Sequence, residues 1–543
     1  MTGGPVSRRT FLAAGAGGVA ALTMPSHVGA QTPKRGGTLV LRTWDPPHFD
    51  HLLAHAYKTH VVVSFTHSRL LRHKAGATVR PGSFALEGDL AESWQQTNET
   101  TYVFKLRKGV RFHAKPPVNG REVTAEDVRY TFDRTLSEKG STNASMYRSI
   151  AKIDALDRYT VRFTLKEPFA WFLDHVANPM AGGIIAKECV EKFGDLKKPE
   201  AVIGTGPWML EVYKPNQSLT LVRNPQYFVP GLPYIDRIEM VVDEDNASRI
   251  AAFLAGKYDL GWEFPGTINR SDWVQIVDTL KKRRPNLRTM EFTSNVVNDF
   301  AMRVDRPPFN DVRVRQALSL AIDRKAIIDA TLEGVGVVNG PVAAALTDWA
   351  LPIDQLGEGA KYYKHDRAEA RRLLAAAGHP NGLPAGVCFA TYGSTLLVDT
   401  IEVILRQLKD AGIDAKLDQK EYGAYQASCR IGKYDSMTFG PLTPFLEPDN
   451  FLFGQYYSGE PRNRSHVQDP VLDDLLVRQR RASDVKARRD VINEIQRYLA
   501  KQQYYVHTPT GTYIAVWDGA LKNYGPNLGY DYGGRLREAW LDR

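Results

Sequence analysis

Many of the side chains that could bind a small molecule are aromatic, and they gather in residues 433–459. The short apolar run 434–439 predicts a buried strand. Gly440-Pro441 and two further prolines then exclude regular structure. The irregular segment nevertheless carries five rings: Phe445, Phe451, Phe453, Tyr456 and Tyr457. A stiff aromatic loop at the end of a strand could form one wall of a pocket, although the same rings could simply pack the loop onto its own domain.

Three histidines near the start of the mature chain raise the question of a metal site. His51 and His55 are spaced i, i+4, which on a helix could hold a metal ion, and His48 precedes them. No carboxylate or cysteine lies nearby with ligand spacing. We therefore expect surface or packing histidines, with no metal and no cofactor.

The motifs of the common hydrolases and nucleotide-binding enzymes are missing from the sequence. It contains no HExxH, GxSxG or P-loop pattern. Carboxylate pairs for acid–base catalysis are not excluded, because such pairs form in space rather than in sequence. We expect a protein that is not an enzyme, with a secreted enzyme as the alternative hypothesis.

Length and composition indicate a soluble protein of several domains. A chain of 543 residues is too long for one hydrophobic core, so two to four domains are expected. Apolar residues make up 43% and charged residues 24%, which is ordinary for a globular protein. The one dense basic run, residues 281–284, is typical of a solvated helix end. We expect no nucleic-acid binding.

The first thirty residues have the features of an export signal. Arg8-Arg9 and Phe11-Leu12 precede a short uncharged run, residues 13–24, that is too short to span a bilayer. Small residues end the segment at Ala30. The paired arginines resemble the twin-arginine signal type. We expect cleavage near Ala30 and a periplasmic mature protein, whose formal net charge falls from +9 to +7 because two arginines and no acid are removed.

The three cysteines allow at most one disulfide. Cys388 and Cys429 are the candidates, and the sequence leaves open whether they pair. Stability does not depend on a disulfide framework in a chain of this size.

Alternating and helical patterns divide the chain into two kinds of unit. In residues 76–202, an alternating strand at 101–106, a capping box at Thr124 and Asp127, and a further strand at 159–165 indicate a small α+β unit. Further on, strand 387–391, helix 396–411 and strand 413–417 form a βαβ unit, which implies parallel pairing. Strand 434–439 would extend the same sheet.

Several motifs, in order along the chain, resemble one family. LAESW, TYVFKLRKGVRFH and TAEDVRYTFDR, in residues 90–134, look like the signature region of the family 5 extracellular solute-binding proteins, the peptide, nickel and opine receptors of ABC importers. The resemblance continues through residues 204–228, 234–260 and 307–327 and returns near EPDNF at 447–451. Matches in this order cover nearly the whole mature chain.

The resemblance implies an α/β fold of two lobes, the large type of periplasmic-binding-protein fold, with an extra small α+β domain inserted in lobe 1. The expected boundaries are the signal peptide at 1–30; lobe 1 at 31–75, 203–292 and 508–543; the inserted domain at 76–202; and lobe 2 at 293–507. It also implies a monomer that captures a small organic ligand, peptide-like or related, by closing its lobes. The closed form would be recognised by the membrane permease of an ABC importer, although a sensor read by another partner remains an alternative.

Ligands in open α/β sheets collect beyond the carboxyl ends of the strands. Strands expected at 37–42, 258–261, 387–391 and 434–439 place six candidate ligand contacts there: Trp44, Trp262, Glu263, Tyr392, Phe439 and Phe445. Each aromatic among them could instead be a core residue. Asp449 and Asn450 are expected to cap the next helix rather than to touch ligand.

One position departs from the family pattern. Peptide-binding members have an aspartate three residues before the acid-Pro pair, where it receives the peptide's α-ammonium. The matching residue here is Pro444, which cannot neutralise a cation. Either another acid such as Glu263 replaces the aspartate, or the ligand is not a peptide with a free amino group.

Overall fold

The computed structural model describes residues 32–53, 57–139, 141, 143–180, 182–263, 266–391, 394–442, 446–529 and 531–543. Lys34–Arg543 form one compact unit, distinct from Met1–Pro33. The signal segment predicted at residues 1–30 lies outside the described residues. Within the described part, no helix has the length and apolarity needed to cross a membrane.

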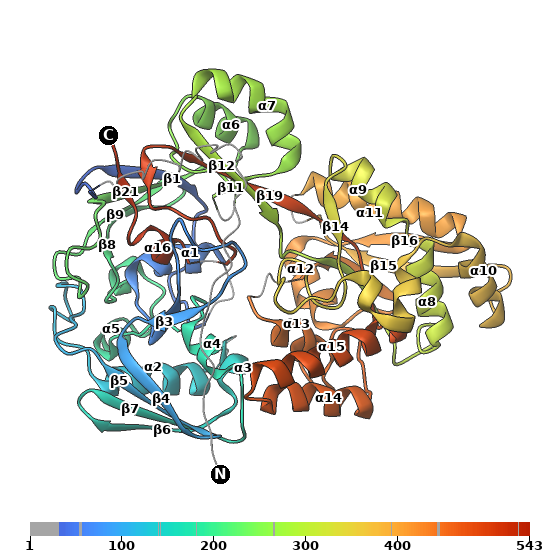
Figure 1. Ribbon diagram of the computed structural model, residues 1–543, viewed down its shortest axis with the longest axis horizontal. Helices are drawn as coiled ribbons and strands as arrows, with labels where there is room; N and C mark the ends of the chain where they lie inside the picture. Colours follow the sequence, from blue (N-terminus) through green and yellow to red (C-terminus); the bar gives the residue numbers. More distant parts are fainter. Residues whose placement is uncertain are drawn as a thin grey trace, which may run out of the picture. The chain divides into compact units, whose positions relative to one another are not determined.

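The first lobe is built on a four-stranded sheet of order β1-β10-β9-β8. β1 (Thr38–Thr43) pairs in parallel with β10 (Arg237–Val242), and β9 (Ser218–Arg223) and β8 (Trp208–Lys214) continue the sheet antiparallel. Its apolar face packs on α1 (Tyr57–Thr66) and α16 (Tyr532–Leu536). The C-terminal residues therefore return to the lobe that also contains β1, the first strand described (Figure 1).

The inserted unit is an antiparallel sheet with a helix across it. Its strand order is β4-β5-β7-β6, and α2 (Ala125–Ser137) packs on β6 and β7. The capping box predicted for Thr124 and Asp127 is present, since each side chain pairs with the backbone of the other. The four strands are β4 (Ala91–Asn98), β5 (Thr101–Leu106), β6 (Ile150–Asp157) and β7 (Thr160–Leu165).

The second lobe contains the predicted βαβ unit. β15 (Leu383–Phe389), α11 (Thr395–Asp410) and β16 (Ile413–Gln419) follow one another, and β15 pairs in parallel with both β16 and β17 (Met437–Pro441). The sheet order is β16-β15-β17-β13-β18. Its last two strands are β13 (Asn298–Met302), antiparallel to both neighbours, and β18 (Tyr505–His507).

The chain passes between the lobes twice, at residues 293–298 and again at 507–509. β12 (Leu287–Thr293) precedes the first passage, and β19 (Pro509–Asp518) follows the second and pairs antiparallel with β12. β14 (Gly336–Val338), which comes from the second lobe, pairs with the first residues of the same β19. Figure 1 shows β19 running between the part that carries β1 and the part that carries β14 and β15.

The remaining elements complete the two lobes and the inserted unit. In the first lobe and inserted unit they are β2 (Leu71–His73), β3 (Leu86–Gly88), α3 (Ala144–Tyr147), α4 (Phe172–Ala177), α5 (Lys187–Phe193), η1 (Pro199–Ala201), α6 (Asn246–Leu254), β11 (Thr267–Ile268), α7 (Arg270–Arg283), β20 (Leu521–Lys522) and β21 (Trp540–Leu541). In the second lobe they are α8 (Val312–Ala321), α9 (Arg324–Thr331), η2 (Ile353–Gln355), η3 (Gly357–Tyr363), α10 (Arg367–Ala376), α12 (Tyr422–Ala427), η4 (Cys429–Ile431), α13 (Pro448–Tyr456), α14 (Pro470–Arg481) and α15 (Val485–Gln502).

Three sequence-based predictions are wrong. The segment after Gly440 is not irregular throughout, because α13 (Pro448–Tyr456) forms within it and carries Phe451, Phe453 and Tyr456. Residues 258–261 do not form a strand, because only Leu260 makes an isolated bridge, to Trp517 in β19. Asp449 and Asn450 are not the cap of α13: the N-cap is Glu447, whose carboxylate accepts a hydrogen bond from the backbone N–H of Asn450. Pro448 occupies the first helical position, where a missing N–H costs nothing, and this favours the residue before it as the cap.

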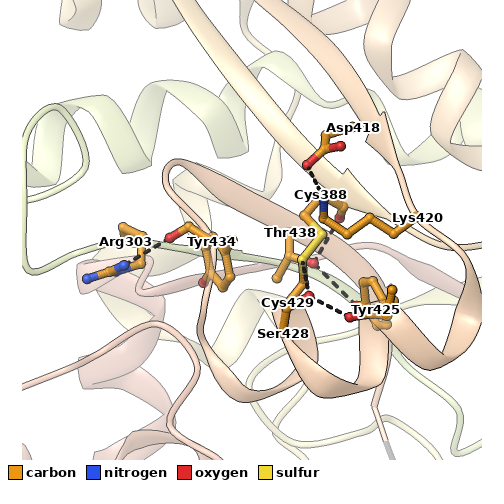
Figure 2. Close-up of a disulfide and its surroundings, with 10 residues drawn as sticks. Arg303, Cys388, Asp418, Lys420, Tyr425, Ser428, Cys429, Tyr434 and Thr438 are labelled. Carbon is orange, nitrogen blue, oxygen red and sulfur yellow. Dashed lines mark hydrogen bonds and ion pairs between the residues drawn. A yellow bond between two sulfur atoms is a disulfide. The ribbon is translucent and has the colours of Figure 1, made fainter.

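The structure also answers the question left open about the cysteines. Cys388 in β15 forms a disulfide with Cys429 in η4 (Figure 2), whereas Cys189 is free and buried. The hydroxyl of Thr438 in β17 donates to the carbonyl of Cys388 at 2.9 Å. The bond therefore fastens α12 and η4 to the two parallel strands that precede the aromatic loop.

Candidate ligand site at the lobe boundary

Trp44 lies where the sequence places it, one residue beyond the carboxyl end of β1. Its side chain is nearly buried, and the guanidinium carbon of Arg42 lies 4.2 Å from the ring centroid. The Nε–H of Arg42 donates a hydrogen bond to the backbone carbonyl of Asp243 at 2.7 Å, which fixes the guanidinium. The ring is thus presented at the strand end by a charged side chain that is itself fixed.

Trp262 and Glu263 differ in their surroundings although they are neighbours in the chain. Trp262 is buried in a small apolar cluster, with its ring 5.4 Å from that of Phe253. Glu263 accepts from the guanidinium of Arg249 at 2.8 Å and keeps about 30% of its side chain exposed. Burial raises the pKa of the Glu263 carboxyl above its usual range, although Arg249 opposes the shift. Of the two, Glu263 has the surface with which to meet a ligand.

Phe439 is the second-lobe candidate that the structure describes, and it lies inside β17, two residues before the end of the strand. Phe439 is fully buried, with Phe300 and Phe389 at ring-centroid distances of 4.8 and 6.4 Å. The ring packs in the lobe core beneath the strand end. Tyr392 and Phe445 lie outside the described residues, as does Pro444.

Side chains of the inserted unit contact the second lobe directly. The indole N–H of Trp171 donates to the side-chain oxygen of Gln479 in α14 at 2.8 Å, and the backbone N–H of Ala170 donates to the carbonyl of Arg480 at 2.7 Å. Trp171 also lies 5.1 Å from Trp349, ring to ring. We call the contacts of residues 167–178 with Trp349, with Glu447 and with α13 to α15 the seam.

Asp449 joins the seam to the helix that follows the aromatic loop. Its buried carboxylate accepts three hydrogen bonds from the guanidinium of Arg480, at 2.8, 3.1 and 2.7 Å, and one from the amide of Gln479. The Arg480 guanidinium in turn stacks 3.2 Å above the ring of Phe453. A bidentate, buried pair of this kind fixes geometry as well as charge. It therefore sets the position of α13 relative to α14.

Glu447, the cap of α13, faces His175 of α4 across the seam. Its carboxylate accepts from the backbone N–H of Asn450 at 3.0 Å and from the Asn450 side-chain amide. The other near neighbour is Nε2 of His175, 3.9 Å from Oε1. Burial, together with the charge of Asp449, raises the pKa of Glu447 to about 8. Burial lowers the pKa of His175 to about 4.

A second buried charge cluster lies on β13 of the second-lobe sheet, between β17 and β18. Asp299 of β13 pairs in register with Gly440 of β17 and with His507 of β18. Its carboxylate accepts from the guanidinium of Arg464, and both side chains are almost wholly buried. Oδ2 of Asp299 lacks a hydrogen-bond partner among the described residues and lies 3.8 Å from Nδ1 of His507. Burial raises the pKa of Asp299 to about 6.

The sequence analysis did not predict these charged clusters, and only the one that contains Glu447 had a recognisable sequence pattern. An acid directly before a proline at a helix start, as in Glu447-Pro448, is a cap signature. Nothing in sequence spacing links Asp299 to Arg464, which are 165 residues apart.

The histidines near the chain start do not come together as a metal site in the described part of the chain. The ring Nε2 of His51 donates to the carbonyl of Gly183 at 3.1 Å, and His55 lies outside the described residues. Across the described residues, no group of three or more His, Cys, Asp or Glu side chains has an arrangement suited to a metal ion.

Two surface hollows, of about 550 and 610 Å³, lie on η2, η3, α14 and α15. The residues that line them include none of the predicted ligand contacts and none of the strand ends. Because their location is unrelated to the chemistry described above, we do not associate them with ligand.

Comparison with known proteins agrees with this architecture. The family model described as "Bacterial extracellular solute-binding proteins, family 5 Middle" matches residues 85–463. Di/tripeptide-binding protein 1 of Pseudomonas aeruginosa (strain UCBPP-PA14) is 30% identical over 468 residues, covering 80% of this chain and 81% of its own. The glutathione-binding protein GsiB of Escherichia coli (strain K12) is 28% identical over 340 residues, 62% of each chain.

Solved structures give the same fold. The periplasmic binding protein DppA of Helicobacter pylori, in complex with the peptide STSA, superposes with a TM-score of 0.78 at 25% identity, covering 94% of this chain and 99% of DppA. AgaA of A. tumefaciens R10, in complex with agropinic acid, gives a TM-score of 0.77 at 23% identity, with 93% and 99% covered, and shows the fold alone. The chain has the two-lobed fold with its inserted domain and belongs to the family 5 bacterial extracellular solute-binding proteins.

Proposed function

We propose that this receptor captures a small organic solute, peptide-like or related, between its two lobes and delivers it to the membrane permease of an ABC importer. The observation that carries the proposal is the seam, where residues 167–178 contact α13 to α15 directly. A single apolar cluster includes Phe104 and Phe163 of the inserted unit and also Phe451 and Leu472 of α13 and α14. Contacts of this kind make a closed form in which a bound solute is shielded from water, which strengthens its polar contacts.

The proposed ligand contacts are Trp44 and Glu263 from the first lobe and Tyr392 and Phe445 from the second. Trp262 and Phe439 act behind them, as the buried support of Glu263 and of the end of β17. Because Pro444 stands where the ammonium-binding aspartate of peptide receptors would be, a ligand cation would pair with Glu263. Its exposed fraction leaves room for a second partner beside Arg249.

The same proposal includes the chain's location and state. The mature protein is periplasmic, monomeric and without nucleic-acid partners or catalytic activity, after cleavage of a twin-arginine-type signal near Ala30. Its boundaries are lobe 1 at 31–75, 203–292 and 508–543, the inserted domain at 76–202 and lobe 2 at 293–507. Strand passages at 293–298 and 507–509 support these limits.

The decisive experiment identifies the solute and then tests one contact. Native mass spectrometry of the protein purified from its own periplasm should reveal a small organic molecule. Calorimetry with that molecule should show affinity reduced at least tenfold by Trp44→Ala, with an unchanged circular dichroism spectrum. Val274→Ala, which truncates an exposed side chain on α7, is the control and should bind normally. Equal affinity for wild type and Trp44→Ala would refute the placement of the site.

A further inference from the structure

The tautomer of His175 is fixed by the backbone. Its Nδ1 lies 2.7 Å from the carbonyl oxygen of Met146. A carbonyl oxygen only accepts, so Nδ1 carries the proton and Nε2 of the neutral ring is an acceptor. Nε2 is buried and lacks a hydrogen-bond partner among the described residues. It is therefore an unsatisfied acceptor inside the seam, which is costly unless a proton reaches it.

The atom that Nε2 faces is also an acceptor when ionised. Oε1 of Glu447 lies 3.9 Å away and already accepts from the amide of Asn450. Two lone pairs thus confront each other between two side chains that are about 4% and 7% exposed. One proton shared by the two groups removes the conflict, because a protonated carboxyl donates to Nε2 with only a small shift of the side chains.

The surrounding charges favour one proton on this pair rather than none or two. Asp174 on α4 and Asp449 on α13 repel a second carboxylate, so they disfavour ionised Glu447. Burial disfavours a protonated His175, and so do the guanidinium groups of Arg480 and Arg462, whereas the charge of Asp449 favours it. Asp449 is itself neutralised by Arg480. Further charged groups near the pair include Arg488 of α15, which acts on Asp174, and Glu460 and Arg430, which act on Arg462.

We propose that Glu447 and His175 form a proton-linked latch, so that closing of the two lobes takes up one proton at neutral pH. The inference rests on the proposed capture by lobe closure and adds its regulation. His175 belongs to the inserted unit and Glu447 to the second lobe, so the pair exists only when the seam is formed. Opening the seam hydrates both groups and returns them to ordinary behaviour.

The pH dependence follows from the protons held in each state. In the open form the two groups titrate near their ordinary values, about 4.3 for Glu and 6.5 for His. Between about pH 6.5 and 8 the closed form holds one proton and the open form none, so the closure constant rises about tenfold for each unit by which pH falls. Between about pH 4.5 and 6.5 both forms hold one proton, and the closure constant is level.

The test measures closure without ligand. Spin labels attached through Lys152→Cys in the inserted unit and Lys486→Cys in α15 occupy exposed positions on the two sides of the seam. The mature chain, stripped of solute, should show the short distance more often at pH 6.5 than at pH 8.5, by at least tenfold in the closed-to-open ratio. An unchanged ratio would overturn the proposal.

Glu447→Gln separates the proton from the contact. The glutamine carbonyl still accepts from the backbone N–H of Asn450, and its amide, in the place of Oε1, donates to Nε2 of His175 without titrating. The hydrogen bond that Oε1 accepts from the Asn450 side-chain amide is lost at every pH, so it changes the closed fraction without making it depend on pH. This variant should lose the pH dependence and stay as closed at pH 8.5 as at pH 6.5; a dependence equal to that of wild type would refute the latch. Glu167→Gln removes another seam carboxylate, one paired with Arg481 at 2.7 Å in an exposed setting, and should keep the wild-type response.

A measurement on the unaltered protein guards against misfolding of the variant. Nitrogen-15 spectra of labelled histidine, recorded on the closed, solute-bound protein, should show His175 neutral with the proton on Nδ1 at pH 6, and a charged His175 there would refute the latch. Failure of the proposed capture is distinguishable, because it would appear as no change in the label distance when the co-purified solute is added. The pH response without ligand does not depend on that result.

Discussion

The buried pair of Asp299 and Arg464 gives the sharpest prediction for stability. Removing one partner leaves the other charge buried without compensation, which costs about 3–5 kcal/mol. Asp299→Asn should therefore lower the free energy of unfolding of the second lobe by that amount. Arg464→Met should do the same, because Oδ2 of Asp299 already lacks a partner among the described residues and Oδ1 would lose its own.

The double variant is expected to be milder than either single one. Burial raises the pKa of Asp299 to about 6 although Arg464 opposes the shift, so burying the charged carboxylate carries a cost that the attraction of Arg464 only partly offsets. Asp299→Leu combined with Arg464→Met removes that cost along with the attraction. We expect a net loss below about 1.5 kcal/mol, and therefore a coupling energy above about 2 kcal/mol.

Urea unfolding followed by circular dichroism at pH 7.5 measures these values, and hydrogen exchange of the β13 amides assigns them to the second lobe. Additive effects of the two substitutions would refute the reasoning. Because the folded pKa of Asp299 is higher than its unfolded value, the folded wild type binds this proton more tightly. Wild type should thus gain stability relative to the double variant as pH falls from about 6 to 4.

Three further predictions concern the seam, the disulfide and acid. Trp171→Phe leaves the Gln479 side-chain oxygen without its donor and should make the free energy of closure of the solute-free chain less favourable by about 1–3 kcal/mol. The distance between the spin labels measures the closed fraction, and an unchanged closed fraction would exclude a role of this hydrogen bond in closure. Replacing Cys388 and Cys429 together by serine should cost about 4 kcal/mol, since 41 residues separate them, and a melting temperature equal to that of wild type would contradict this. Burial lowers the pKa of His73 and His113 to about 4 and of His507 to about 3. Below pH 6.5 the folded state therefore holds fewer protons than the unfolded state, and each histidine should remove up to about 1.4 kcal/mol of stability per unit of falling pH. The melting temperature should be lower at pH 5 than at pH 7.5, and equal values would refute this.

The parts of the fold that sequence could predict are those with local causes. Helix 396–411 and its flanking strands agree with α11, β15 and β16 within a few residues, because apolar periodicity and the glycine after the helix act locally. The capping box at Thr124 was equally local. Residues 258–261 were misassigned because their apolar pattern serves packing beneath β19 rather than a ladder of strand pairs.

The site was predictable only to the level of strand ends. Trp44 follows β1 as expected, whereas Phe439 precedes the end of β17 and packs into the core. The hydrogen bonds of the seam join segments hundreds of residues apart, as the one between Trp171 and Gln479 does. No spacing rule links such residues, because their meeting depends on how the lobes close.

β19 has a mechanical consequence. Its residues 509–511 pair with β14 of the second lobe and its residues 512–518 with β12 of the first. One continuous strand is thus hydrogen-bonded to the second lobe at its beginning and to the first lobe over the rest of its length. A rotation between the lobes must twist the backbone near Gly511, where one set of hydrogen bonds ends and the other begins. Gly511→Val should therefore restrict the backbone of β19 at this point and slow the opening and closing of the lobes, while β19 keeps its hydrogen bonds to β12 and β14.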